Sequence, residues 1–219
     1  MSCFRRTHLA SVVFVAAASW AAAAPAGQPK WKSLFDGKRL GKWQMVDKFD
    51  FINHGKVEVK DGALVLHKGQ PGTAARYTGK LPKIDYEVEL EGKRVEGSDF
   101  FCGMTFQVGE EALTLICGGW GGSVTGVSCI HGEPAVENET AGYTDFENGR
   151  WYKIRLRVTE KKIEAWIDKE QIVELPTEGR KFTIWFEPET ALPLGIATWE
   201  TTGAIRNIRV RSIEPGAVR

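Results

Sequence analysis

Residues 100–117 read FFCGMTFQVGEEALTLIC, and apolar side chains occupy every second position in two runs. The first run places on one side Phe100, Cys102, Met104, Phe106 and Val108. The second run has Leu113, Leu115 and Cys117 at its alternate positions. Alternation of this kind predicts two half-buried β-strands, and Gly109-Glu110 between them fits a two-residue II′ turn. Val108 then faces Glu111, and Cys102 lies opposite Cys117.

The cysteines of this predicted hairpin bear on the redox state of the protein. Counted back from the turn, Cys102 and Cys117 form a hydrogen-bonded pair, whose wide separation disfavours a strain-free disulfide. Cys129 adds a third cysteine to the pair, and Cys3 lies in the leader described below. We therefore expect buried free thiols.

Two further segments show the same alternation. Over residues 86–91, Tyr and branched apolar residues alternate with three carboxylates, Glu87, Glu89 and Glu91. The simplest interpretation of this row is a solvated strand face, and the alternative is a concave sheet whose carboxylates contact sugar hydroxyls. Residues 152–158 and 163–167 form a second predicted hairpin, with Val158 opposite Ile163. This register pairs Arg157 with Glu164 and places Arg155 beside Trp166.

The rest of the chain also indicates strands. They are expected at residues 57–59, 63–67, 172–175, 183–186, 194–199 and 205–213. No segment after the leader sustains a helical apolar stripe over three turns. About a dozen strands with short turns predict an all-β fold, a jelly-roll sandwich of two antiparallel sheets.

The first residues indicate export. Arg5 and Arg6 precede an alanine-rich apolar stretch, and small residues at Ala24 and Ala26 offer a cleavage site, so we predict a signal peptide over residues 1–26. Residues 27–219 are then a single domain in a periplasmic or extracellular protein. Without the leader, 27 basic residues face 28 acidic ones, a net charge of −1 that argues against nucleic acid as a partner. No other apolar run approaches membrane length, so no membrane insertion is expected.

The run Cys117-Gly118-Gly119-Trp120-Gly121-Gly122 places an indole among glycines. Glycine permits positive φ and close backbone approach, so Trp120 is expected at a sheet rim. An indole held there is a platform for the apolar face of a sugar ring. The alternative is a bulged strand whose tryptophan fills the core.

Several motifs resemble one family. The opening residues 34–40 (LFDGKRL) with Trp43, the turn at residues 59–64 (VKDGAL), the strand start at residues 151–155 (WYKIR) and the endings 194–197 (LGIA) and 206–209 (RNIR) are similar to the 3-keto-disaccharide hydrolase family. The likeness spans nearly the whole mature chain. It implies a concanavalin-like fold and cleavage of 3-keto glycosides.

The implied reaction begins at the acidified C2 proton of a 3-keto sugar. It needs a base, a donor to the enolate oxygen and an acid for the leaving oxygen. His131 is the expected base because its ordinary pKa lies nearest neutral pH. Arg94 or Asn138 would hold the enolate oxygen, and Glu133 or Glu139 would be the acid if burial raises its pKa. Water then adds to the enone.

The expected saccharide contacts also include Asp99, Trp120 and Trp199. Each candidate has a structural alternative: His131 and Glu133 lie in a sequence typical of a turn, Asp99 fits a turn cap, and Arg94 fits a salt bridge to a neighbouring glutamate.

A non-catalytic carbohydrate-binding module is the alternative function. Its platforms would be Trp120, Trp166, Trp185 and Trp199. His54, His67 and Asp61 match no metal-ligand spacing, so no cofactor or metal site is predicted, although a divalent cation stays open. The sequence contains no nucleophile elbow, the motif that would indicate a serine hydrolase.

Overall fold

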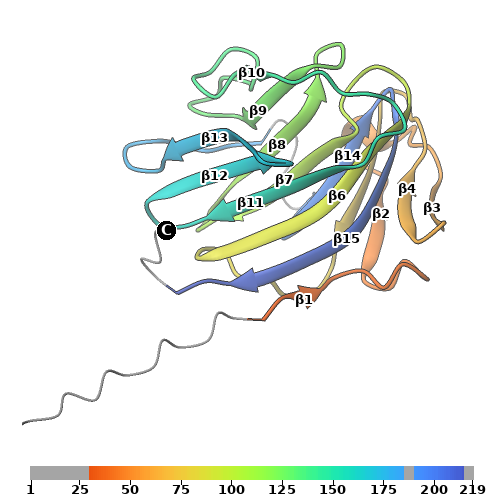
Figure 1. Cartoon of the computed structure of the whole chain (residues 1–219), viewed down its shortest axis with the longest axis horizontal. Helices are drawn as coiled ribbons and strands as arrows, with labels where there is room; N and C mark the ends of the chain where they lie inside the picture. Colours follow the sequence, from red (N-terminus) through yellow and green to blue (C-terminus); the bar gives the residue numbers. More distant parts are fainter. Residues whose placement is uncertain (1–29, 185–189, 215–219) are drawn as a thin grey trace, which may run out of the picture.

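The computed structural model describes residues 30–184 and 190–214, and these form two antiparallel sheets packed face to face (Figure 1). The strands of the eight-stranded sheet are, in spatial order, β13 (Glu170–Pro176), β12 (Lys162–Ile167), β11 (Tyr152–Val158), β6 (Tyr86–Glu96), β15 (Thr202–Ser212), β4 (Ala63–Leu66) and β3 (Val57–Lys60), with β1 (Lys32–Ser33) paired to β15. Those of the seven-stranded sheet are β10 (Gly142–Tyr143), β9 (Val124–Ser128), β8 (Glu111–Gly119), β7 (Cys102–Val108), β14 (Leu194–Trp199), β5 (Gly72–Tyr77) and β2 (Trp43–Val46). The predicted all-β jelly-roll sandwich is confirmed.

Helical structure is minimal in the described ranges, where the one helical element is the short 3-10 helix η1 (Phe49–Phe51). No helix in this part of the chain has the length and apolar character needed to cross a membrane. The predicted signal peptide and Trp185 lie outside the described residues.

The core lies between the sheets and is built from the alternate apolar residues that the sequence indicated, with the exception of Phe100. Phe101 lies in the core instead, and Phe100 lies on the outer face of the seven-stranded sheet. Met104, Leu115 and Ile154 are fully buried there, together with aromatic residues such as Phe106 and Tyr152. Burying each such side chain stabilises the fold by about 1.5–3 kcal/mol relative to exposure. Because strand side chains alternate, each sheet turns its other residues away from this core.

The registers of both hairpins are as predicted. Cys102 lies opposite Cys117 and Val108 opposite Glu111, while the β11–β12 hairpin pairs Val158 with Ile163. All three cysteines in the described residues are free and buried, which confirms the expected thiols. Contact with the Cys102 thiol, together with burial, raises the pKa of Cys117 well above its usual value.

The strand predicted at residues 183–186 is wrong over its described part, residues 183 and 184. Instead, Thr183 exchanges two backbone hydrogen bonds with Cys129, at 2.7 and 3.1 Å. This local pairing ties the chain after β9 to the segment that follows β13.

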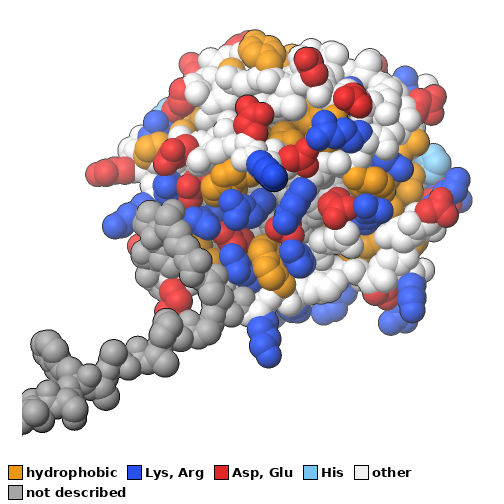
Figure 2. All heavy atoms as spheres, viewed as in Figure 1, with side chains coloured by type: hydrophobic (Ala, Val, Ile, Leu, Met, Phe, Trp, Pro, Cys, Tyr) orange, Lys and Arg blue, Asp and Glu red, His pale blue; other side chains and the backbone are white. Residues whose placement is uncertain are grey.

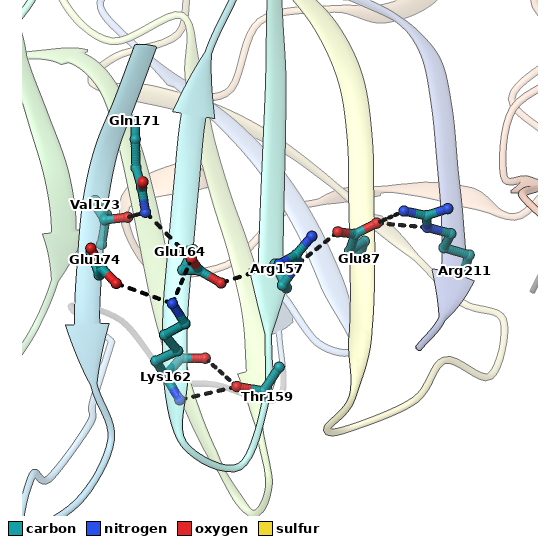
Figure 3. Close-up of polar contacts among 9 residues, drawn as sticks. All are labelled: Glu87, Arg157, Thr159, Lys162, Glu164, Gln171, Val173, Glu174 and Arg211. Carbon is teal, nitrogen blue, oxygen red and sulfur yellow. Dashed lines mark hydrogen bonds and ion pairs between the residues drawn. The ribbon is translucent and has the colours of Figure 1, made fainter. Parts of the chain in front are cut away.

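The solvated interpretation of the row Glu87, Glu89 and Glu91 is also wrong for its first two members, which are buried, whereas Glu91 is partly exposed. Glu87 is fully buried between Arg157 of β11 and Arg211 of β15 (Figure 3). Glu89 pairs with Lys153 and Arg209. Neighbouring strands thus cover the carboxylates with cations, and Figure 2 shows lysine and arginine side chains gathered across this face.

Candidate functional site

A hollow of about 230 Å³ opens on the outer face of the seven-stranded sheet, the face turned away from the core. Its lining side chains come from three strands and two loops: Asp99, Phe100, Thr114, Ile116, Trp120, Ser128, Ala197 and Trp199. The sheet can be hollowed here because most of its outward side chains are short.

Two rows of outward residues run across the strands of this sheet, and the floor of the hollow takes two residues from each: Ser128 and Thr114 from the first, and Ile116 and Ala197 from the second. Pairing in register places side by side the polar row Ser128, Thr114, Thr105, Gly195, Arg76 and Gln44. The adjacent row is small and mostly apolar: Gly126, Ile116, Gly103, Ala197, Ala74 and Val46. Two apolar side chains beside two hydroxyls on this floor match a sugar ring, which has apolar faces and a polar edge.

The hydroxyls on this floor are ordered by neighbouring groups. The Oγ1 atoms of Thr105 and Thr114 lie 2.9 Å apart in a hydrogen bond. The Ser128 Oγ accepts a hydrogen bond from the Ala135 backbone N–H at 2.7 Å. A hydroxyl that accepts one bond still carries a proton to donate, so Ser128 can serve a polar ligand.

The glycine-rich loop, residues 118–122, presents Trp120 at the rim of the hollow. Trp120 has a φ of +49° and is 46% exposed, so the rim interpretation is confirmed and the core interpretation is wrong. Gly118 and Gly122 also have positive φ, and a Cβ at Gly118 would lie 2.5 Å from the Arg94 Nη2. The loop therefore requires glycine where the sequence has it.

Two aromatic side chains form the other wall. The rings of Phe100 and Trp199 lie 6.1 Å apart between centroids, within the range for favourable aromatic pairs. Phe100 also packs over Gly103, where a Cβ would come within 3.0 Å of its ring. Trp199 is thus held beside the hollow, as its predicted role requires.

Asp99 lies in the hollow between these aromatic residues. Its Oδ1 accepts a hydrogen bond from the Phe100 N–H at 2.7 Å, and its Oδ2 accepts one from Gly121 at 3.0 Å. Its own N–H donates to the Thr201 Oγ1 at 3.0 Å. The carboxylate therefore joins the glycine-rich loop to the start of β7, and the predicted cap is part of this arrangement.

Arg94 lies behind the loop and does not line the hollow. Its Nη2 donates to the Gly122 carbonyl at 2.6 Å and, at a longer 3.5 Å, to that of Gly118. The guanidinium also stacks near Phe101 and Phe146. Burial lowers the pKa of Arg94, and the nearby Asp99 charge partly offsets that effect. The structure uses Arg94 to hold the loop, without the salt bridge to a neighbouring glutamate that the sequence left open.

Asn138 is buried and fully engaged in hydrogen bonds. Its Nδ2 donates to the carbonyls of Val127 and Glu133, at 2.8 and 3.0 Å. Its Oδ1 accepts from the Thr140 N–H and Oγ1, at 2.9 and 2.7 Å. Since an amide has two donor hydrogens and two acceptor sites, Asn138 fastens the segment after β9 to that strand.

The three predicted catalytic residues lie on this same segment and are exposed: His131, Glu133 and Glu139. The described lining of the hollow includes none of them. Glu139 forms an ion pair with Arg180 at 3.0 Å, and its pKa is lowered by a backbone hydrogen bond and that pair. The condition set for an acid, a pKa raised by burial, is therefore not met at Glu139. The catalytic roles of the three residues stay predictions.

Five lining residues were not among the predicted contacts: Phe100, Thr114, Ile116, Ser128 and Ala197. The alternation signal could have found Thr114 and Ile116, because each is the outward neighbour of core-facing residues in the predicted hairpin. Ser128 had no such signal, since no strand was predicted at residues 124–128.

Metal ligands are sparse in residues 30–184 and 190–214, where no three His, Cys, Asp or Glu side chains are grouped to hold an ion. His67 contacts the Glu58 carboxylate through Nε2 at 2.8 Å, and His54 contacts the Gly55 carbonyl through Nδ1. Both histidines are thus engaged locally.

The fold has relatives among solved structures. A Bacillus subtilis protein of unknown function with a galectin-like fold aligns with a TM-score of 0.61 at 11% identity, covering 87% of this chain and 98% of that one. SCLam, a non-specific endo-β-1,3(4)-glucanase of family GH16, aligns with a TM-score of 0.57 at 10% identity, covering 88% and 94%. Domain 4 of the Geobacillus stearothermophilus arabinanase AbnA, solved with arabinotriose, gives 0.50 at 15% identity, covering 78% and 82%.

At such low identities these likenesses establish the fold alone, a jelly roll of the galectin and concanavalin type. No curated protein matches the sequence significantly. A sequence model for the 3-keto-alpha-glucoside-1,2-lyase-like domain matches residues 30–211. The resemblance noted in the sequence is thereby confirmed, and the chain belongs to the 3-keto-disaccharide hydrolase family.

Proposed function

We propose that this protein is an exported carbohydrate-active enzyme that binds a small 3-keto glycoside in the hollow beside Trp120. The observation that carries the proposal is the meeting of two indoles, Trp120 and Trp199, with one carboxylate, Asp99, above a floor that carries the hydroxyls of Thr114 and Ser128. Family membership supplies the reaction class. Export rests on the predicted signal peptide.

The sugar would lie with an apolar face against Trp120. Stacking on an exposed indole gives a large apolar contact area, and the rigid indole side chain loses little conformational entropy when the sugar binds. The hydroxyls of Thr114 and Ser128 on the floor would bond the polar edge of the ring. The small side chain of Ala197 on the floor leaves space for the ring.

The reaction would proceed by removal of the C2 proton, elimination of the C1 substituent and addition of water to the enone. A ketone at C3 is essential, because only then is the C2 proton acidic and its carbanion delocalised on oxygen. This requirement gives a discriminating assay. The purified protein should release p-nitrophenol from p-nitrophenyl 3-keto-glucoside and leave the unoxidised glucoside intact.

The same assay tests the alternative of a non-catalytic carbohydrate-binding module. The observation that favours the module is that the carboxylate in the described lining already accepts two backbone hydrogen bonds. A protein that quenches its tryptophan fluorescence with saccharide but releases nothing from several keto glycosides would be such a module. Release from the unoxidised glucoside would contradict both proposals.

A further inference from the structure

We infer that Asp99 is the base that removes the C2 proton, which gives the site proposed above its catalytic group. Among the described residues that line the hollow, Asp99 is the titratable one. His131, the expected base, lies on the exposed segment after β9 and is absent from that lining. This inference rests on the proposed function.

The carboxylate is held in a fixed orientation but keeps capacity to accept a proton. Each oxygen accepts one backbone N–H, from Phe100 or Gly121. A carboxylate has about four acceptor sites, so each oxygen retains a free lone pair. A base held by backbone bonds loses little orientation entropy when substrate arrives.

A buried arginine behind the glycine-rich loop helps to hold Asp99 in this orientation. Gly121 lies between Trp120, which would stack on the sugar, and Gly122, whose carbonyl accepts from the Arg94 Nη2 at 2.6 Å. Arg94 is 5% exposed, so its hold on the loop is shielded from water. Arg94 thus acts as a positioning residue, because one glycine-rich loop sets both the stacking indole and the donor that orients Asp99.

The chemical step balances without a further reactant. Asp99 takes the C2 proton, and the C–H electron pair forms the C2–C3 double bond of an enolate while the carbonyl pair moves to oxygen. The carbonyl then re-forms, the C1–C2 double bond forms and the C1–O bond breaks. The departing oxygen takes a proton from water, and protonated Asp99 returns its proton to solvent.

Deuterium exchange isolates the step assigned to Asp99. In D2O the enolate is quenched by a deuteron, so NMR of a 3-keto sugar with a free anomeric centre should show loss of the C2 proton signal with wild-type protein. Asp99→Asn should slow this exchange about 10²–10⁴-fold, the usual contribution of a positioned base. Glu96→Gln, at an exposed carboxylate at the end of β6, is the matched control and should exchange at the wild-type rate.

A rescue experiment separates catalysis from loop support, because Asn at position 99 has one acceptor oxygen and can keep only one of the two bonds from the Phe100 and Gly121 N–H groups. Asp99→Ala should lose exchange and regain it in part when formate is added, since formate can enter the space and act as the base. A purely structural role predicts no rescue, and that result would overturn the inference. Wild-type exchange in Asp99→Asn would also overturn it, as would loss of exchange in His131→Ala with Asp99→Asn unaffected.

The outcomes also separate this inference from the proposed function. If the wild-type protein neither cleaves keto glycosides nor exchanges the C2 proton, the proposed function fails and the inference with it. If the wild type does both and the Asp99 variants do so equally well, only the assignment of the base fails.

Discussion

The two sheets turn very different surfaces away from their shared core. On the seven-stranded sheet most outward residues are short, and three of them, Thr114, Ser128 and Ala197, line a hollow. On the eight-stranded sheet they are long and charged, as at Glu87, Arg157 and Arg211, and they fill their face with ion pairs (Figure 3). The same strand geometry thus yields a hollowed surface on one sheet and a surface covered by ion pairs on the other.

Tryptophans sharpen this difference. On the eight-stranded sheet each of three indoles carries cations over its ring: Trp31 near Arg209 and Arg211, Trp151 near Lys93 and Arg206, and Trp166 near Arg155 and Arg157. Trp120, at the rim of the hollow, is 46% exposed, so part of its ring is open to a ligand. Trp166 is therefore a poor saccharide platform, because the Arg155 guanidinium lies 3.9 Å from its ring centroid.

The largest expected effect on stability comes from the charged face, at Glu87. Glu87→Gln leaves the guanidinium groups of Arg157 and Arg211 facing a neutral amide, and both arginines are largely buried. Breaking a buried ion pair by removal of one partner costs about 3–5 kcal/mol. Urea unfolding should show a lower midpoint with an unchanged m value.

The matched control for Glu87 is Glu110→Gln, in an exposed pair with Lys83. It should change the free energy of unfolding by no more than about 1 kcal/mol. Equal effects of the two substitutions would mean that the ion-pair face contributes no more to stability than ordinary surface charges.

Acid should weaken the charged face before it affects the floor of the hollow. Burial opposes ionisation of Glu89, but its pairs with Lys153 and Arg209 outweigh burial and lower its pKa; Glu91 is lowered in the same way, chiefly by Arg206 against burial. A carboxyl with a lowered pKa in the folded state adds stability above its unfolded pKa and loses that contribution as pH falls through the folded pKa.

The free energy of unfolding should therefore decline as pH falls below about 4.5, the ordinary value for these groups. Arg209→Gln removes one cation from Glu89 and should make the decline shallower. Denaturant titrations at a series of pH values measure both slopes, and identical slopes would contradict the role given to this pair.

A substitution at the hollow should weaken the affinity of the protein for saccharide and leave its free energy of unfolding nearly unchanged. Trp120→Ala removes the exposed platform, and we expect the Kd for a bound saccharide to rise about tenfold, or about 1.4 kcal/mol. Unfolding should shift by no more than about 0.5 kcal/mol, because the side chain is half exposed. Trp31→Ala on the opposite face is the control and should leave the Kd unchanged. Equal losses in the two variants would show that Trp120 does not mark the binding face.

The sequence predicted the sheets better than it predicted what covers them. Alternation showed that Glu87 points outward, but its partners lie 70 and 124 residues further on, at Arg157 and Arg211. Sequence spacing cannot align distant strands, so a buried carboxylate was interpreted as a solvated one. Hairpin registers succeeded because a short turn fixes which residues face each other.

The predictions for the candidate site show the same difference between local and distant features. Glycines around Trp120 report a local backbone requirement, and Trp120 lies at the rim as predicted. His131 was chosen for its ordinary pKa from a set of polar residues that lie near the glycine-rich run in sequence. The backbone hydrogen bonds of Cys129 and His131 to Thr183 and Lys181 instead direct its segment toward a different part of the chain. Nearness in sequence gave no measure of nearness in space once a strand and a turn intervened.

The smallest expected effect isolates the contact that distinguishes Trp166 from Trp120. A double-mutant cycle with Arg155→Met and Trp166→Leu should give a coupling energy of about 0.5–1 kcal/mol, the usual strength of an exposed cation–π pair. Methionine keeps much of the apolar stem of arginine, so the cycle reports the charge over the ring and not lost packing. Chemical unfolding of the four proteins measures the coupling. A value of zero would mean that the guanidinium only rests on the indole, and Trp166 would then regain its candidacy as a saccharide platform, because displacing Arg155 would cost little free energy.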